Sequence, residues 1–356
     1  MEFLTGLIQF VLALVALILI HEFGHFLAAK FFKVEVEEFG IGFPPRVATL
    51  FQWKETKFTL NALPLGGFVR PKGENDPSVE GGLAAANPWV RLVVLFAGPA
   101  MNLLLGVILY AVIFMNVGVP DYDRVMIADI AENSPAHEAG LVPGDVILEI
   151  EGADVKSTTD LQEAVQSSLG TPIDIAYERE GEVQHVELTP RVNPPEGEGA
   201  IGILMSNPIN QEANFFEALP AGGYAVVQHS RALLELPFRM IQGTISPEEG
   251  RVVGFVGMFN IFQEAREGEP TVGISPLLGV LSFVTSITIS LGLLNLVPFP
   301  ALDGGRILFT LPEIILRKRI PPQYENVINL IGFGLLLLLM IYINLQDIFS
   351  PPTLTR

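Results

Sequence analysis

Phe3–Ile20, FLTGLIQFVLALVALILI, continues directly into His21-Glu22-Phe23-Gly24-His25, and this stretch decides the fold. The first 18 residues carry no charge and reach the roughly 18–20 residues that an α-helix needs to cross a bilayer. No basic segment precedes them and no small-residue cleavage site follows them. The sequence therefore predicts a retained membrane helix and not a cleaved signal peptide.

Three further uncharged stretches are long enough to cross a membrane: Leu92–Pro120, Thr271–Leu302 and Asn326–Gln346. The whole chain of 356 residues is only 17% charged, whereas a soluble domain carries about 25%. These features predict a polytopic α-helical membrane protein with about four transmembrane helices. Its membrane parts are expected at residues 1–120 and 271–356.

Basic residues are unevenly distributed among the connecting loops, and this predicts an orientation. They gather between the first and second stretches (Lys30, Lys33, Arg46, Lys72, Arg91) and between the third and fourth (Arg317-Lys318-Arg319). By the positive-inside rule these two loops are cytoplasmic. Both termini and the middle of the chain are then expected outside the cytoplasm.

The middle of the chain is acidic, with 8 Lys/Arg against 26 Asp/Glu between Val119 and Ser275. Nucleic acid is therefore not expected as a partner of this block, because binding it requires basic patches. The chain has no cysteine, which excludes disulfides and thiolate ligands. Any metal site must be built from His, Asp and Glu.

An inserted α+β domain is predicted at residues 121–205, followed by a linking region at 206–270. Strands are expected at Val125–Ile130, Val146–Ile150, Ile173–Tyr177 and Val183–Leu188, with a helix at Thr159–Ser168 capped by Thr158 or Thr159. Apolar residues are mixed with polar ones from Phe215 to Ile245. This pattern is typical of an amphipathic helix, which lies either on the membrane or against the globular domain.

The loop after the first helix predicts a membrane-associated β-hairpin. Val47–Trp53 and Lys57–Leu63 have strand-like composition around the turn Lys54-Glu55-Thr56, and Leu65-Gly66-Gly67-Phe68-Val69 follows. The hairpin is either a simple cytoplasmic element or an edge that holds an extended peptide by backbone hydrogen bonds.

His21, Glu22 and His25 carry the chemistry of the first stretch. Histidines four residues apart lie on one face of a helix, so both rings can reach a single zinc ion. The glutamate between them can take a proton from a water that the metal activates. The alternative is a helix end that has simply reached the interface, but Phe26–Ala29 continue the apolar run and argue against it.

A third protein ligand is needed for a catalytic zinc site. His137, His185 and His229 all lie in the acidic middle block, away from His25 in the predicted orientation. Asp303 closes the third apolar stretch, where Pro298 and Pro300 break the helix. Because broken backbone at membrane depth is tolerated only where it lines a cavity or is buried in protein, Asp303 is the candidate third ligand.

The chain resembles the site-2 protease family of intramembrane zinc metalloproteases, in particular bacterial members like the regulator-of-sigma-E protease. The resemblance covers nearly the whole chain through His21–His25, Leu63–Val69, Gly98-Pro99-Ala-Met-Asn102 and Asn295–Gly305. It implies that His21, His25 and Asp303 bind one Zn²⁺ per chain and that Glu22 is the general base. It also implies that Asn295, Pro298 and Pro300 position the substrate, while Asn102 is structural or supports a metal ligand.

The inserted domain resembles a PDZ domain through Ser134-Pro135-Ala136, Ala139-Gly140-Leu141 and Gly144-Asp145-Val146-Ile147. The family resemblance implies an inner-membrane enzyme, with its active site near the cytoplasmic side, that cuts within or beside transmembrane segments. Its expected partners are the lipid bilayer and single-span regulators such as anti-sigma factors, or signal-peptide remnants. The PDZ domain either docks substrates or filters them by size. The alternatives are a membrane-tethered PDZ scaffold with an inactive site and a zinc transporter.

Overall fold

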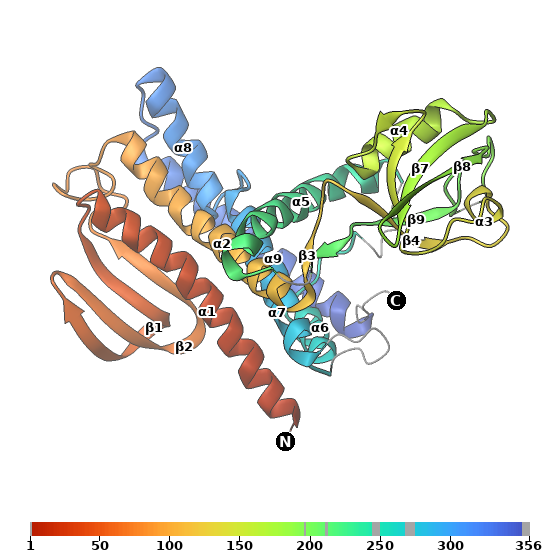
Figure 1. Cartoon of the computed structure of the whole chain (residues 1–356). Helices are drawn as coiled ribbons and strands as arrows, with labels where there is room; N and C mark the ends of the chain where they lie inside the picture. Colours follow the sequence, from red (N-terminus) through yellow and green to blue (C-terminus); the bar gives the residue numbers. More distant parts are fainter. Residues whose placement is uncertain (1, 196, 211–212, 244–249, 268–274, 351–356) are drawn as a thin grey trace. The chain divides into compact units, whose positions relative to one another are not determined.

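The computed structural model describes residues 2–195, 197–210, 213–243, 250–267 and 275–350 (Figure 1). The chain divides into two compact units, one made of Met1–Ile113 and Gly222–Arg356 and the other of Phe114–Ala221. The second unit is wider than the inserted domain expected at 121–205. The reason is that β3 (Val119–Pro120) pairs with β10 (Ile209–Asn210), so both ends of the insertion belong to it.

Four helices of the described chain are long and apolar enough to cross a membrane, as predicted. They are α1 (Glu2–Phe31), α2 (Pro88–Val117), α7 (Pro276–Leu296) and α9 (Pro322–Phe349). The first helix extends well beyond the apolar run, and it places His21, Glu22 and His25 inside regular helix. This protein is therefore an integral membrane protein.

The predicted break of the third apolar stretch at Pro298 and Pro300 is confirmed, but the separate helix that follows it was not predicted. Helix α7 ends at Leu296, and a separate helix, α8 (Asp303–Leu316), begins at the aspartate itself. Residues 297–302 form an irregular link that contains Pro298 and Pro300. The helix breaks here because a proline inside a helix lacks a backbone donor and clashes with the preceding turn. Residues 271–274 of the predicted stretch lie outside the described residues.

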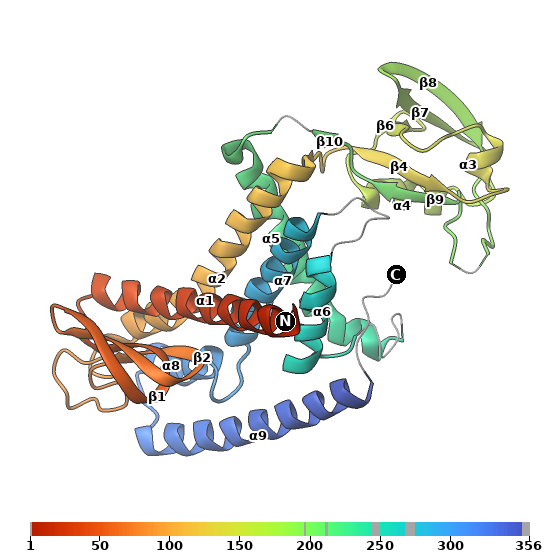
Figure 2. The same cartoon turned by 90° about the horizontal axis from the view of Figure 1, so that it is seen from below.

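The predicted hairpin is larger than its sequence signals suggested. Strands β1 (Val36–Trp53) and β2 (Thr56–Pro71) are both long, and together they form a sheet beside the C-terminal half of α1 (Figures 1 and 2). Residues 36–43 of β1 pair on one side with residues 57–63 of β2 and on the other with residues 67–71. Residues 57–61 also pair with residues 46–52 of β1, so the predicted strand Lys57–Leu63 has partners along both sides. Gly67–Pro71 pairs on one side only and forms an edge of the sheet.

The inserted unit is a six-stranded antiparallel sheet with two helices, α3 (Pro135–Glu138) and α4 (Thr158–Ser167). Its strands are β4 (Val125–Ile130), β5 (Val146–Ile150), β6 (Ala153–Asp154), β7 (Ile173–Arg179), β8 (Glu182–Leu188) and β9 (Ile203–Ser206). The four predicted strands and the helix are confirmed. The predicted cap is wrong, since the Ser157 side chain accepts from Asp160 N–H. Buried Val, Ile and Leu side chains form its core.

Two further helices link the insertion to the third membrane helix. The amphipathic stretch is α5 (Phe215–Ile241), and α6 (Phe255–Glu267) was not predicted. Asp347 of α9 is fully buried and anchors α6: its carboxylate accepts from Gly254 N–H at 2.8 Å and Gly257 N–H at 3.0 Å. Arg251 lies 2.6 Å from the same carboxylate. Residue 347 thus satisfies the otherwise free N–H groups at the start of another helix.

Replacing Asp347 with Ala should destabilise the protein by about 3 kcal/mol, because it leaves the largely covered Arg251 guanidinium and two backbone donors without their acceptor. Thermal unfolding in detergent measures this change. Glu264→Ala, an exposed acidic position on α6, is the matched control and should keep the wild-type midpoint. Equal midpoints for the two variants would contradict the anchoring role.

Candidate metal centre and active site

One face of α1 carries the candidate ligands toward the rest of the membrane unit. Its buried residues include Phe10, Leu17, His21 and Gly24, which recur at helical spacing. A side chain at Gly24 would clash with the Ala97 carbonyl, so α1 and α2 approach each other closely at this point. The HExxH segment is thereby pressed against α2.

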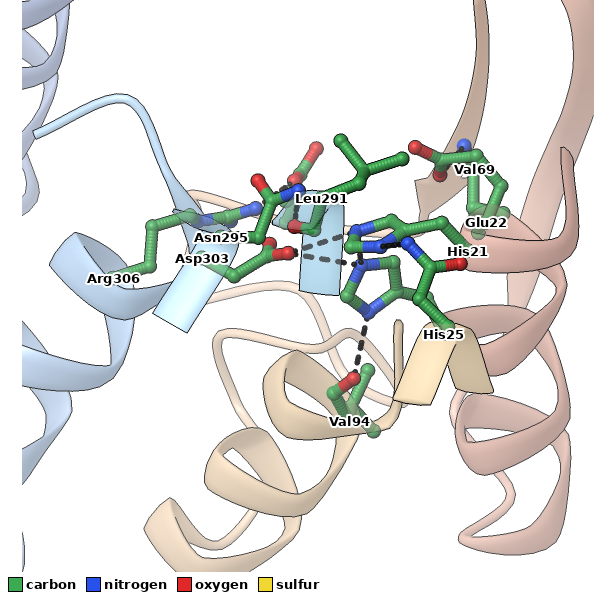
Figure 3. A network of polar contacts seen from close by, with 11 residues as sticks. His21, Glu22, His25, Val69, Val94, Leu291, Asn295, Asp303 and Arg306 are labelled. Atoms are coloured by element: carbon green, nitrogen blue, oxygen red, sulfur yellow. Dashed lines mark hydrogen bonds and ion pairs between the residues drawn. The ribbon is translucent and has the colours of Figure 1, made fainter. Parts of the chain in front are cut away.

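His21, His25 and Asp303 come together, although 278 or more residues separate the aspartate from the histidines (Figure 3). Asp303 Oδ2 lies 3.0 Å from His21 Nε2 and 3.3 Å from His25 Nε2, and the two Nε2 atoms are 3.2 Å apart. Ligand atoms about 2.0 Å from a tetrahedral zinc ion are about 3.3 Å from each other. The three atoms therefore match one face of a zinc coordination tetrahedron.

The outer nitrogens of both rings have partners that orient them. His25 Nδ1 lies 2.8 Å from the carbonyl oxygen of Val94, so it donates its proton there and leaves Nε2 free for a metal. Asn102 is fully buried, and its amide lies 3.2 Å from His21 Nδ1. Its Oδ1 has no hydrogen-bond partner among the described residues. If the Asn102 carboxamide is turned by about 180°, its oxygen accepts the proton on His21 Nδ1.

Gly98 leaves the space that a metal ion would need, and sequence reasoning did not single it out as a site residue. A Cβ atom at this position would lie 2.8 Å from His21 Nε2 and still closer to His25 Nε2. Gly98 belongs to the Gly98–Asn102 segment that carried the family resemblance. That segment was therefore the available signal, but only the packing of α1 against α2 shows its purpose.

The irregular link before α8 places Asp303 next to His21 and His25. Ala301 has a φ of 76°, an uncommon backbone conformation for a residue with a side chain, and Asn329 of α9 accepts its N–H at 3.1 Å. Pro300 packs against Gly332 of the same helix. Neither Pro298 nor Pro300 is among the residues that line the cavity around the histidines, and their role in positioning substrate stays a prediction.

Glu22 lies in a cavity of about 240 Å³ that it shares with the three candidate ligands, Asn295 and other residues. Its carboxylate accepts a hydrogen bond of 2.9 Å from Val69 N–H, on the edge of the sheet. Asn295 Nδ2 donates to the Leu291 carbonyl at 2.9 Å, which fixes the orientation of its amide in the cavity wall. The cavity thus combines a metal-ligand set with a carboxylate able to accept a proton.

The other histidines are not part of this group. His137 lies in α3 and His185 in β8, while His229 in α5 bonds with Tyr110. Among the described residues, His21, His25 and Asp303 form the one cluster able to hold a metal ion.

A helical membrane protein with an HExxH motif in one span and a carboxylate from a later helix has the site of a membrane metallopeptidase. Residues 9–339 match peptidase family M50, and the chain belongs to this family. It is a metalloendopeptidase.

Three relatives show how far the similarity extends. A putative zinc metalloprotease of Clostridium perfringens is 33% identical and covers 96% of this chain and 97% of its own length. A putative zinc metalloprotease of Campylobacter jejuni is also 33% identical, and the match covers 95% of this chain and 92% of that protein. The regulator of sigma-W protease RasP of Bacillus subtilis is 26% identical, and the match covers 97% of this chain and 99% of that protein.

Among solved structures, the PDZ domain of an SdrC-like protein of Listeria monocytogenes covers 24% of this chain and 88% of that domain. It is 26% identical, with a TM-score of 0.21.

Replacing Gly98 with Ala should abolish stoichiometric zinc binding, because the new methyl group would occupy the space between the two histidine nitrogens. Metal analysis after loading with Zn²⁺ measures this. Gly334→Ala is the matched control, since a Cβ at that position in α9 meets no atom within 4 Å. Full zinc content in the Gly98 variant would show that the metal sits elsewhere.

Asn102→Leu should lower zinc affinity about 10–100-fold, because it removes the partner that orients His21. Asn102→Asp keeps an oxygen that can accept from the His21 ring and should stay near the wild-type affinity. Competition with a chelator of known affinity gives both values. If Asn102→Leu binds zinc as tightly as the wild type, the amide has no orienting role.

Proposed function

We propose that this protein is a zinc-dependent intramembrane protease that hydrolyses peptide bonds within or next to transmembrane segments of other proteins. The proposal is carried by one observation: Asp303, at the start of α8, meets His21 and His25 beside Glu22. These last three residues lie on α1, a helix long enough to cross a membrane. Ionisable groups at that depth are costly and mark functional sites. The names of the relatives, which include zinc metalloproteases, support the same reading.

One zinc ion per chain fits the ligand set, with His21, His25 and Asp303 as its protein ligands. When bound, it supplies Lewis-acid chemistry that polarises the scissile carbonyl and acidifies the attacking water. Three protein ligands leave a further coordination position open, as in catalytic zinc sites and unlike structural ones. The missing side chain of Gly98 leaves room beside the Nε2 atoms of His21 and His25.

The Glu22 carboxylate acts as general base and then as general acid. It takes a proton from the attacking water and afterwards passes it to the leaving amine. The backbone N–H of Val69 donates a hydrogen bond to one carboxylate oxygen of Glu22. This bond restricts the rotamers of Glu22 and brings no charged group to it. Asn295 lies in the same cavity wall and is placed to contact the backbone of the substrate.

A helical substrate must unwind before its peptide bonds can react, because every backbone group in a helix is already paired. The edge Gly67–Pro71 lies directly beside Glu22 and can pair with the unwound segment by strand addition. Within the Val47–Leu63 hairpin expected from the sequence, residues 57–60 are paired on both sides and Val47–Trp53 on one side only, so the sheet has two edges. The edge beside Glu22 is Gly67–Pro71. Strand addition would present an extended chain to the metal site.

The inserted unit is proposed to be a PDZ domain that docks substrates or filters them by size. Its Ser134-Pro135-Ala136 segment begins α3, with the Ser134 hydroxyl capping the helix. Asp145, fully buried, accepts from Val142 N–H at 2.8 Å and pairs with Arg179. Strand β9 lies at one edge of the sheet, where a peptide could be added.

The proposed substrates are single-span membrane regulators such as anti-sigma factors, or signal-peptide remnants. The name of RasP, a regulator of sigma-W protease, supports the first class. The distribution of Lys and Arg supports an inner-membrane orientation with the active site near the cytoplasmic side. The inserted unit and both termini then lie on the opposite side.

Glu22→Gln should reduce turnover at least about a hundredfold while zinc stays bound, because Gln cannot accept the proton of the attacking water. Cleavage of a tagged single-span substrate by purified protein in detergent measures turnover, with and without a zinc chelator. Glu264→Gln on exposed α6 serves as the control.

Wild-type turnover in Glu22→Gln would refute the general-base role. No cleavage and no bound zinc in the wild type would favour a membrane-tethered PDZ scaffold.

A further inference from the structure

Arg306 places a permanent positive charge in the wall of the active-site cavity. It lies one turn after Asp303 on α8, and among the described lining residues it is the only arginine or lysine. Its Nη1 atom lies 2.6 Å from Glu74 Oε1, in the loop that follows β2. Neither residue was singled out from the sequence, because 232 positions separate them.

The Arg306–Glu74 pair stands between two cavities. A second, smaller cavity of about 20 Å³ adjoins the first, and both are lined by Glu74, Leu83, Leu95 and Arg306. This volume suffices for about one water molecule. The side chains of Arg306 and Glu74 are 23% and 31% exposed, so the pair is largely covered and yet can be reached from the active-site cavity.

Peptide hydrolysis creates charges where the substrate had none. The water oxygen joins the carbonyl carbon, the C–N bond breaks, and at neutral pH the acid loses a proton while the amine gains one. The products are one carboxylate and one ammonium group. An unpaired charge in a covered, low-dielectric site costs several kcal/mol, so both new termini need partners before they can leave.

We propose that the Arg306–Glu74 pair is a product-binding site, in which Arg306 takes the new C-terminal carboxylate and Glu74 takes the new ammonium group. This inference rests on the proposed protease function. The exchange keeps every charge paired, since each member of the resident pair has the sign that one product terminus requires. A guanidinium group suits this task because it binds a carboxylate with two parallel hydrogen bonds.

Product inhibition of the zinc-loaded protein tests the proposal. The probes are a short leucine-rich peptide with a free C-terminal carboxylate and the same peptide ending in an amide, each added to the single-span cleavage assay. The wild type should be inhibited more strongly by the carboxylate. In Arg306→Gln this preference should fall about tenfold, which corresponds to about 1.4 kcal/mol, while Arg306→Lys should keep part of it. Any contribution of zinc to carboxylate binding is common to all three proteins.

Glu74→Gln should change inhibition by the carboxylate peptide in the opposite direction from Arg306→Gln. This variant therefore separates product binding from an ion pair that is only structural. Removing the resident partner frees Arg306, so the carboxylate peptide should inhibit this variant at least three times more strongly than the wild type. A pair that only ties the loop to α8 would weaken binding in both variants. The control is Arg231→Gln, an arginine of an exposed ion pair on α5, which should behave as the wild type.

The outcomes separate this inference from the proposed function. A wild type that cleaves, with an unchanged carboxylate preference in Arg306→Gln, would overturn the product site alone. A wild type that does not cleave any substrate would overturn both. If Arg306→Gln fails to fold, as shown by its unfolding midpoint and zinc content, Arg306→Lys and Glu74→Gln decide the matter.

Discussion

The close approach of α1 and α2 is the constraint on which the rest of the site depends. Gly24 and Gly98 carry no side chain where the helices meet, and this lets the HExxH face lie directly against α2. At that distance Val94 and Asn102 can reach the outer nitrogens of both histidines. A larger residue at Gly24 would clash with the Ala97 carbonyl, and one at Gly98 would clash with the rings of His21 and His25, so helix packing and the candidate metal site share one requirement.

A second requirement is the break between α7 and α8. An unbroken helix would continue the backbone through this region, whereas the break lets Asp303 begin a new helix facing the histidines. The freed backbone groups must find partners within the protein, because the hydrocarbon of a bilayer offers no hydrogen-bond partners. Asn329 accepts from Ala301, and Pro300 packs on Gly332, so the last membrane helix stabilises the geometry of a site that it does not line.

The sheet after α1 adds the groups that a peptide would meet. Its edge strand donates from Val69 to Glu22, and the loop that follows brings Glu74 to Arg306. The metal-ligand set, the proton acceptor, a strand edge and an ion pair therefore surround one cavity, although they come from four separate parts of the chain. In the proposed function, this arrangement would serve substrate binding, hydrolysis and charge compensation around one cavity.

The sequence by itself determined what is encoded locally: four apolar spans, two histidines on one helical face, the strand and helix positions of the insertion, and a carboxylate beside prolines. These follow from hydropathy and from the 3.6-residue and two-residue periods of helices and strands. Contacts visible only in the folded protein show which strand edge lies beside Glu22, that Gly98 lies against the rings of His21 and His25, that Asp347 anchors α6, and that Glu74 pairs with Arg306. Each of these depends on contacts between residues far apart in the chain, and local periodicity carries no information about such contacts.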